Sequence, residues 1–432
     1  MSYTITRAIA VVAVSAAAAA LPRSGAGQGT PKQVVKPPIS QAWIDVATFS
    51  GMSMGPGMMN ATLGSLMGGG GGNQKAEFGY TETGTAGRWM DVTLYTSRNT
   101  SLAEATQAVP AGTQLAPTLK LQTPERPKPP PPADDGPSEF NYEPPKGKLV
   151  MYWGCSETVR PGQPKIVDLS TATIAELGKF FESRRATQRG AHATFGRPVW
   201  PSKDDKRALP PGSSIVGQHS FKGEGVPESF SFTIPAAQDV MPAIEVRQEK
   251  GPTAVKLSWT AIPQARAYFL GSMGGLPDGE QGILLWTSSE LPESGFGLFD
   301  YQTNTAVDGW VRDRVLLAPT VTTCSVPNEA AGQGMLRAIA YGTELNLAHP
   351  ARPTDPKISW EPEWNLKIRV KSMSTTMMGM EGSMPGMDAG AEGAAPADPA
   401  AAPGEQPAEE QKKKKKFNPF EVIKDAVKDA VP

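Results

Sequence analysis

Short runs in which apolar and polar residues alternate recur along much of the chain and predict β-strands. In Arg88–Thr96, the residues Met90, Val92 and Leu94 alternate with polar neighbours, which is the period of a strand with one buried face. The run Leu149–Trp153 is apolar at every position, as is typical of a strand inside a sheet. The pattern therefore predicts a mainly β fold.

One helical signal interrupts these strands. Thr173 and Glu176 have the spacing of a capping box, in which each side chain bonds the backbone N–H of the other residue. Ile174 and Phe181 then fall on one face of the helix that would follow. We expect one short helix here, inside a β-rich domain that spans residues 41–242.

Three segments of biased composition divide the chain. They are a Met/Gly-rich loop at 52–72, a Pro-rich insertion at 124–145, and a linker at 373–411 that is first Met-rich and then Ala/Pro-rich. Such compositions are typical of disordered loops and linkers, because they bury little apolar surface. A second β-domain is expected over residues 243–372, so the predicted architecture is two tandem β-sandwich-like domains followed by residues 412–432.

The second domain contains four runs with a recognisable order: Val255–Trp259, Ala265–Leu270, Arg337–Ala340 and Trp364–Lys371. They resemble strands B, C, F and G of a fibronectin type III or immunoglobulin-like module. The resemblance implies a β-sandwich that binds, spaces or scaffolds a partner, and a fold alone does not fix which. The segment Val307–Leu317 could instead be helical.

The amino terminus has the pattern of a secretory signal peptide. Arg7 precedes an unbroken apolar run, Ala8–Ala20, whose end Ala18–Ala20 offers a cleavage site. The run is too short to span a hydrocarbon core, which needs about 20 residues. We expect residues 1–26 to be removed and residues 27–40 to form an extended leader, with an uncleaved anchor as the alternative. The mature protein would then be periplasmic or secreted, without a lipid anchor or a transmembrane helix.

The chain has two cysteines, Cys155 and Cys324. Export would bring them into an oxidising compartment, where a disulfide between them is permitted. Two buried thiols that act as small apolar side chains are the alternative. Two cysteines cannot supply a structural zinc site made from four.

Methionines are concentrated in the two Met-rich segments. Thioethers select Cu(I), so a copper site is one candidate function, and the segments resemble the methionine-rich tracts of periplasmic copper-handling proteins. The alternatives are adaptable apolar filler and a partner-binding tail. No other cofactor is expected. The candidate ligands are Met52, Met54, Met58, Met59, Met373, Met377, Met378, Met380, Met384 and Met387.

Signals for catalysis are absent from the sequence. Its three histidines, His192, His219 and His349, lie far apart, and no zinc-protease, P-loop or nucleophile-elbow motif occurs. A net charge of −1 gives no overall attraction to nucleic acid. A local basic excess between Lys179 and Arg207 predicts either a solvated surface or a site for an anionic polymer. We therefore expect a protein that is not an enzyme and does not bind nucleic acid.

The last residues, 412–432, combine a lysine run with the signals of a short amphipathic helix. Asn418 is a candidate N-cap, Pro419 suits the first helical position, and Glu421 suits the third. So short a helix is marginal alone in water. We expect it to dock on an envelope protein, or on an anionic membrane or polymer, with docking on its own domain as the alternative. The docking residues are Phe417, Phe420, Ile423 and Val427 with Lys412, Lys413, Lys414, Lys415 and Lys416.

These features predict a non-catalytic, exported cell-envelope protein whose β-domains bind or scaffold a partner. Its carboxyl-terminal helix would tether it to that partner or to the envelope. The alternative is a periplasmic copper-handling protein that uses the Met-rich segments.

Overall fold

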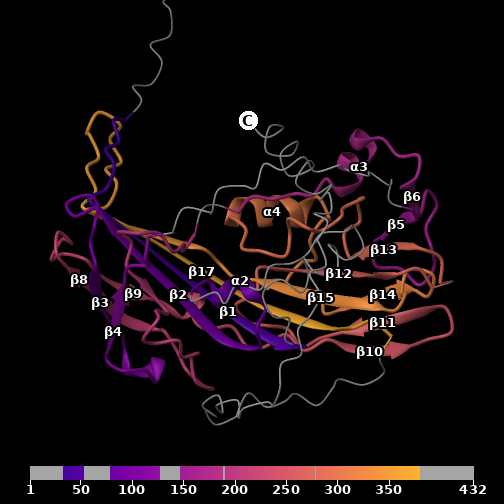
Figure 1. Ribbon diagram of the computed structural model, residues 1–432, viewed down its shortest axis with the longest axis horizontal. Helices are drawn as coiled ribbons and strands as arrows, with labels where there is room; N and C mark the ends of the chain where they lie inside the picture. Colours follow the sequence, from indigo (N-terminus) through magenta and orange to yellow (C-terminus); the bar gives the residue numbers. More distant parts are fainter. Residues whose placement is uncertain (1–32, 53–77, 127–145, 188–189, 278, 380–432) are drawn as a thin grey trace, which may run out of the picture.

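The computed structural model describes residues 33–52, 78–126, 146–187, 190–277 and 279–379. The fold is mainly β, which confirms the predicted fold class (Figure 1). Within the described residues, one large sheet contains 14 strands and a small sheet contains three. The helices are few and short.

The elements have the following bounds. The large sheet contains β1 (Ser40–Gly51), β2 (Gly87–Thr96), β3 (Glu104–Ala108), β4 (Thr118–Gln122), β5 (Lys148–Trp153), β6 (Lys165–Asp168), β7 (Val199–Trp200), β8 (Gly217–Gly223), β9 (Ser231–Ile234), β12 (Ala267–Gly275), β13 (Gly282–Thr287), β15 (Gly334–Tyr341), β16 (Leu345–His349) and β17 (Trp364–Met377). The small sheet contains β10 (Arg247–Lys250), β11 (Ala254–Ser258) and β14 (Thr323–Pro327). The helices are α2 (Tyr80–Thr83), α3 (Ile174–Phe181) and α4 (Asn304–Arg312), with 3-10 turns η1 (Ala111–Thr113) and η2 (Ala236–Gln238).

The long strand β17 joins the two halves of the large sheet. It pairs in parallel with β1 from Ser40 opposite Trp364 to Gly51 opposite Thr375. Its other edge pairs with β15 and β16, and the far edge of β1 pairs with β2. In the same way β5 pairs with β13. The boundary predicted at residue 243 thus falls between strands that are hydrogen-bonded in one sheet.

Two layers face each other in the second half of the chain. The large sheet contributes β13, β12, β15 and β17 in that order, and the small sheet contributes β10, β11 and β14. Leu257 and Val326 of the small sheet belong to the same buried cluster as Leu270 and Leu336 of the large sheet. Because alternate side chains point to one face of each sheet, the apolar faces enclose a common core.

The first half of the large sheet curls back on itself. It runs from β1 through β2, β7, β4, β3 and β8 to β9. Just before β9, the carbonyl oxygen of Ser229 accepts a hydrogen bond of 3.0 Å from Nε1 of Trp364 in β17. The rings of Phe230 and Trp364 also stack, with centroids 4.7 Å apart. The curl encloses a core in which Trp200 and Val92 are fully buried.

Several local predictions match the structure. Oγ1 of Thr173 accepts a hydrogen bond from the backbone N–H of Glu176, and the Glu176 carboxylate accepts one from the N–H of Thr173, which completes the capping box of α3. Strand β5 lies between β6 and β13, as its apolar sequence predicts. Part of Val307–Leu317 is helical, although α4 begins earlier because Thr303 caps it.

Other predicted segments lie outside the described residues. They are the signal peptide, nearly all of the Met/Gly-rich loop, most of the Pro-rich insertion, and everything after residue 379. Of the leader predicted at 27–40, residues from 33 onward are described; Val35 forms a bridge with Trp360, and Ser40 already belongs to β1. In the part of the chain that the structure describes, no helix is both long and apolar enough to cross a bilayer.

Candidate binding cleft on the large sheet

A row of charged side chains crosses the middle of the large sheet on one face. Asp45 in β1 is in register with Asp91 in β2 and with Arg369 in β17, so these three side chains project from the same face. Lys371 lies two residues after Arg369 and shares that face. All four residues are at most 4% exposed. Buried charges require partners, and these partners define the site.

Asp45 and Arg369 form a bidentate ion pair. Nε of Arg369 donates to Oδ1 of Asp45 and Nη2 donates to Oδ2, both at 2.7 Å. The backbone N–H of Ala191 also donates to Oδ2 of Asp45 at 2.9 Å, and Nη1 of Arg369 donates to Oγ1 of Thr187 at 3.3 Å. The ion pair therefore holds Thr187 and Ala191 against the sheet.

Gly190 lies directly on this ion pair. A Cβ atom at Gly190 would be 1.7 Å from Nη2 of Arg369 and 2.7 Å from Oδ2 of Asp45. No side chain fits there unless the ion pair moves. The chain can approach the pair so closely only because the residue is glycine.

Asp300, in the loop before α4, neutralises Lys371. Nζ of Lys371 lies 3.3 Å from Oδ1 of Asp300, and Nη2 of Arg185 lies 3.7 Å from Oδ2. Burial alone would raise the pKa of Asp300, but Lys371, the backbone N–H of Tyr301 and Arg369 outweigh burial and lower that pKa. Nζ of Lys371 also lies 4.1 Å from the ring centroid of Tyr301, a cation–π contact.

Asp91 has a different environment. Oδ2 accepts hydrogen bonds from the N–H of Thr81 at 2.8 Å and from Oγ1 of Thr81 at 2.6 Å, whereas Oδ1 has no hydrogen-bond partner among the described residues. Burial raises the pKa of Asp91 to about 7, although the Thr81 bonds oppose the shift and Asp45 adds to it. Asp91 is therefore partly protonated near neutral pH, which limits its repulsion with Asp45.

Thr81 belongs to α2, which also carries Glu82. Glycines in the left-handed conformation flank this short helix, Gly79 with φ 90° and Gly84 with φ 72°. Glu82 is exposed to solvent, and among the described residues its carboxylate has no hydrogen-bond or ion-pair partner. Partial burial and then the charge of Asp300 raise the pKa of Glu82, and Lys371 offsets part of this effect.

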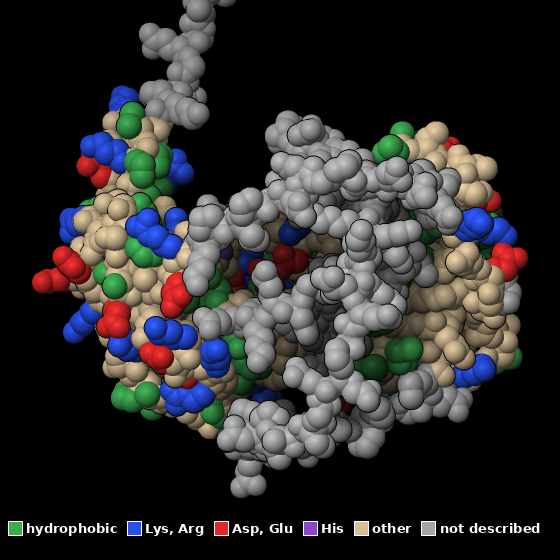
Figure 2. Space-filling view, viewed as in Figure 1, with side chains coloured by type: hydrophobic (Ala, Val, Ile, Leu, Met, Phe, Trp, Pro, Cys, Tyr) green, Lys and Arg blue, Asp and Glu red, His purple; other side chains and the backbone are tan. Residues whose placement is uncertain are grey.

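These groups surround a cleft with a volume of about 560 Å³. Figure 2 shows acidic and basic side chains together deep in the hollow in the middle of the molecule's face. Figure 1 shows α2 over the centre of the sheet, beside β1 and β2. The volume is within the usual range for sites that bind small molecules. The cleft is lined by Phe78, Glu82, Arg185, His192, Asp300 and Arg369, among others.

The charged residues that line the cleft make it suitable for a ligand with polar groups. Its two arginines, Arg185 and Arg369, are ion-paired with Asp300 and Asp45, while Glu82 is exposed to the cleft. In the described parts of the chain, no group of three or more His, Cys, Asp or Glu residues is arranged to hold a metal ion. The paired charges fix the walls, and Glu82 offers an acceptor to a ligand.

These residues were not predicted from the sequence, although a signal for Asp45 is present in it. The run Ala42–Phe49 is apolar on both faces except at Asp45 and Thr48. This pattern is typical of a strand buried on both sides, in which a charge needs a partner.

No family model matches the chain, and no curated protein matches it. The function of the cleft therefore has to follow from its own geometry and chemistry.

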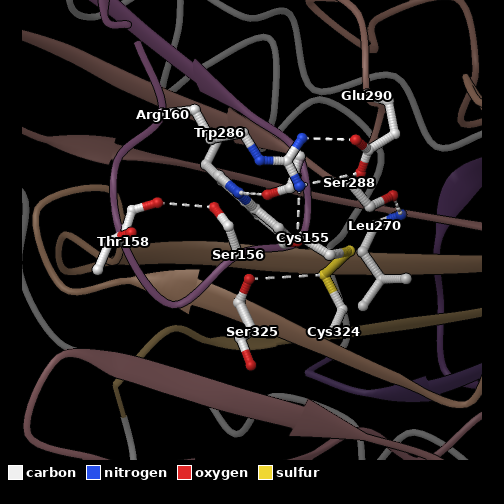
Figure 3. Close-up of a disulfide and its surroundings, with 11 residues drawn as sticks. Cys155, Ser156, Thr158, Arg160, Leu270, Trp286, Ser288, Glu290, Cys324 and Ser325 are labelled. Carbon is white, nitrogen blue, oxygen red and sulfur yellow. Dashed lines mark hydrogen bonds and ion pairs between the residues drawn. A yellow bond between two sulfur atoms is a disulfide. The ribbon is translucent and has the colours of Figure 1, made fainter.

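Cys155 and Cys324 form a disulfide with an S–S distance of 2.11 Å (Figure 3). Cys155 directly follows Gly154 after β5 of the large sheet, and Cys324 lies in β14 of the small sheet, so the bond links the two layers. Beside it, Arg160 forms an ion pair with Glu290 and donates to the carbonyl oxygen of Cys155 at 2.8 Å. Neither cysteine is among the residues that line the charged cleft.

Four of the proposed copper ligands are described. Met373 and Met378 are 3% and 2% exposed and pack in apolar clusters, so in this conformation their sulfurs are not open to a metal ion. Met377 is half-buried and Met52 is 43% exposed. Met54, Met58, Met59, Met380, Met384 and Met387 lie outside the described residues, as do the docking residues Phe417, Phe420, Ile423, Val427 and Lys412 to Lys416.

Part of the basic stretch between Lys179 and Arg207 is paired with acids. Arg184 pairs with Glu293 at 2.9 Å and Arg207 pairs with Asp205 at 2.8 Å. Arg197 lies over the ring of Tyr95, with its guanidinium carbon 4.5 Å from the centroid. These three arginines are therefore held by contacts within the protein, which supports the interpretation of this stretch as a structural surface.

Proposed function

We propose that the protein is a non-catalytic, exported binding protein of the cell envelope that holds a small polar ligand in the cleft above β17, β1 and β2. One observation carries this proposal: buried ion pairs hold both walls of a preformed cleft of about 560 Å³. Binding sites are usually preformed in this way, because a rigid site loses less entropy when the ligand enters.

Two features support the exported, modular part of the proposal. The disulfide between Cys155 and Cys324 suits an oxidising compartment, as does the signal-like pattern at residues 1–26. The run that resembles strand B lies in the small sheet, while those that resemble C, F and G are neighbours in the large one. An immunoglobulin-like sandwich divides its strands in the same way. Residues 412–432 would serve as the tether to an envelope partner or an anionic surface.

A substitution that fills the cleft with a large side chain tests the proposed binding function. Ala193 lines the cleft and is exposed, so Ala193→Trp should block it without touching the ion pairs. Ala175→Trp, at an exposed position of α3, is the matched control. Each protein is dialysed against a small-molecule extract of the source cells, and retained compounds are identified by mass spectrometry. We expect at least one compound to be retained by the wild type and by Ala175→Trp but not by Ala193→Trp. Equal retention by all three proteins, or none by any, would reject the proposal.

Copper handling remains a second candidate because of one observation. Strands β1 and β17 are parallel, and Gly51 is in register with Thr375, so the ends of these two strands, where the Met-rich segments adjoin them, lie side by side. Met52 and Met377 stand at this point. Copper analysis after loading with Cu(I) and desalting tests the idea. Stoichiometric copper that is lost in the double variant Met52→Leu, Met377→Leu would support it, and the absence of retained copper would reject it.

A further inference from the structure

We infer that the ligand of this cleft carries a cationic nitrogen, a primary ammonium or a guanidinium, and that Glu82 binds it. This inference rests on the proposed binding function and specifies its ligand class. It follows from the distribution of charge in the cleft, from the place of Glu82 in its wall, and from the apolar surface beside Glu82.

The charges of the cleft are unequally compensated. Arg369 forms its bidentate pair with Asp45, and Lys371 and Arg185 both face Asp300. An anionic ligand would have to compete with these carboxylates, which are already placed against the cations. The carboxylate of Glu82 has no such partner among the described residues. A cation can therefore bind at Glu82 without breaking an existing ion pair, whereas an anion at Arg369 or Lys371 would have to displace Asp45 or Asp300.

The surroundings of Glu82 favour a positive charge. Burial and the charges of Asp300 and Asp45 raise the pKa of Glu82, and Lys371 and Arg369 offset only part of this shift, so the surroundings disfavour its ionised form. A cation bound beside Glu82 would reverse this effect and lower its pKa. Binding of a cation should therefore release protons at a pH where Glu82 is partly protonated, because the two equilibria are linked.

The helix that carries Glu82 is anchored before any ligand arrives. Its neighbour Thr81 makes two hydrogen bonds to the buried Asp91, which ties α2 to the sheet. Gly79, just before α2, has no heavy atom of another described residue within 4 Å of an added Cβ, apart from its chain neighbours, so the described residues leave space on that side. A carboxylate on an anchored helix, next to open space, can receive a ligand with little rearrangement.

The body of the ligand should be apolar and small. Phe78, Ala191 and Ala193 line the same cleft as Glu82 and provide apolar surface, and an aromatic ring can also contact the cation itself. A divalent metal ion is a poorer fit, because calcium takes six to eight oxygen ligands and the described residues hold no group of three acidic or histidine side chains arranged for a metal. An organic amine with a short carbon skeleton matches the volume and the chemistry.

The test uses three probes with a similar carbon skeleton and different charge: 2-phenylethylamine, 2-phenylethanol and 3-phenylpropionate. Isothermal titration at several pH values from 4.5 to 7, in two buffers that differ in ionisation enthalpy, gives the affinity and the number of protons released at each pH. The wild type should bind the amine at least tenfold more tightly than the alcohol, with proton release, and should bind the carboxylate most weakly.

The variant Glu82→Gln should reduce the preference for the amine to less than threefold and abolish the proton release. Glu157→Gln, at an exposed carboxylate outside the cleft, should behave as the wild type. If the alcohol or the carboxylate binds as tightly as the amine, or if Glu82→Gln leaves the preference unchanged, the inference is wrong. The proposed function still stands in that case if Ala193→Trp prevents the binding. If no probe binds the wild type at millimolar concentration, the inference also fails, and the dialysis experiment decides the proposed function separately.

Discussion

Asp45 and Asp91 lie directly opposite each other on neighbouring antiparallel strands, with both side chains buried on the same face. Two ionised carboxylates in this position would repel each other. The structure resolves the conflict by giving them different partners. Arg369 pairs with Asp45, while Asp91 accepts hydrogen bonds from Thr81 and keeps a raised pKa of about 7.

The first prediction is that Asp91 makes the protein less stable as the pH rises. Its pKa is about 7 in the folded state, against 3.8 for the unperturbed group. Between these values the unfolded chain loses a proton that the folded protein keeps. The contribution of Asp91 to the free energy of unfolding is therefore complete below about pH 4, falls as the pH rises, and levels off above pH 7. Between pH 5 and the folded-state pKa of about 7 lie two pH units, each worth about 1.4 kcal/mol. The free energy of unfolding should therefore fall by about 3 kcal/mol between pH 5 and pH 8 through this group.

Urea unfolding of the wild type and of Asp91→Asn at these two pH values measures this contribution. Asparagine has the shape of the protonated acid and does not titrate, so the variant should lack this part of the pH dependence. The difference between the two proteins also cancels the contributions of other groups, such as His219, whose pKa burial lowers. An identical pH dependence in both proteins would contradict the raised pKa of Asp91.

The second prediction concerns the Asp45–Arg369 pair. Asp45→Asn leaves the charge of Arg369 buried without its carboxylate, so the free energy of unfolding should fall by about 3–5 kcal/mol. Glu361→Gln breaks the exposed pair with Lys36 and should cost less than about 1 kcal/mol. Urea unfolding compares both variants with the wild type. A similarly small loss of unfolding free energy in the two variants would contradict a buried ion pair between Asp45 and Arg369.

The third prediction concerns the glycine above that pair. Gly190→Ala should destabilise the protein and weaken ligand binding in the cleft, because a Cβ there would push the chain off Arg369. Gly178→Ala, in α3, has no other heavy atom within 4 Å of its added Cβ and should stabilise the protein by about 0.5–1 kcal/mol. Calorimetry of both variants checks the contrast. Equal melting temperatures for the two would contradict the close approach at Gly190.

The fourth prediction is that the disulfide stabilises the two-layer part of the fold. Cys155 and Cys324 are separated by 169 residues, so reduction frees a long loop in the unfolded chain and should cost about 2–4 kcal/mol. Native, oxidised protein should show no thiol that can be alkylated, and reductant should lower its melting temperature. Two thiols that react freely in native protein would contradict the bond.

Local sequence patterns predicted elements well and pairings poorly. The alternation in Arg88–Thr96 predicted β2, and Thr173 with Glu176 predicted the start of α3, because both signals depend on neighbouring residues. The parallel pairing of β1 with β17 joins residues more than 300 positions apart, and no local pattern records it. That pairing places strands from both predicted domains in one sheet.

The cleft was missed for a related reason. Alternation shows that one face of a strand is polar, but it does not show whether that face is solvated or covered. Asp91 stands at a polar position of β2 and has the pattern of a solvent-facing residue. In the structure it is 1% exposed, because α2 and the charged residues of β1 and β17 lie around it.

A crystal structure of the protein with a compound retained in the dialysis experiment would show directly whether the cleft is the binding site. We expect electron density for that compound in the cleft, in contact with Phe78 and Ala193, and with a cationic nitrogen within hydrogen-bonding distance of the Glu82 carboxylate. Density for the compound at another surface, with the cleft empty, would show that the cleft is not the binding site.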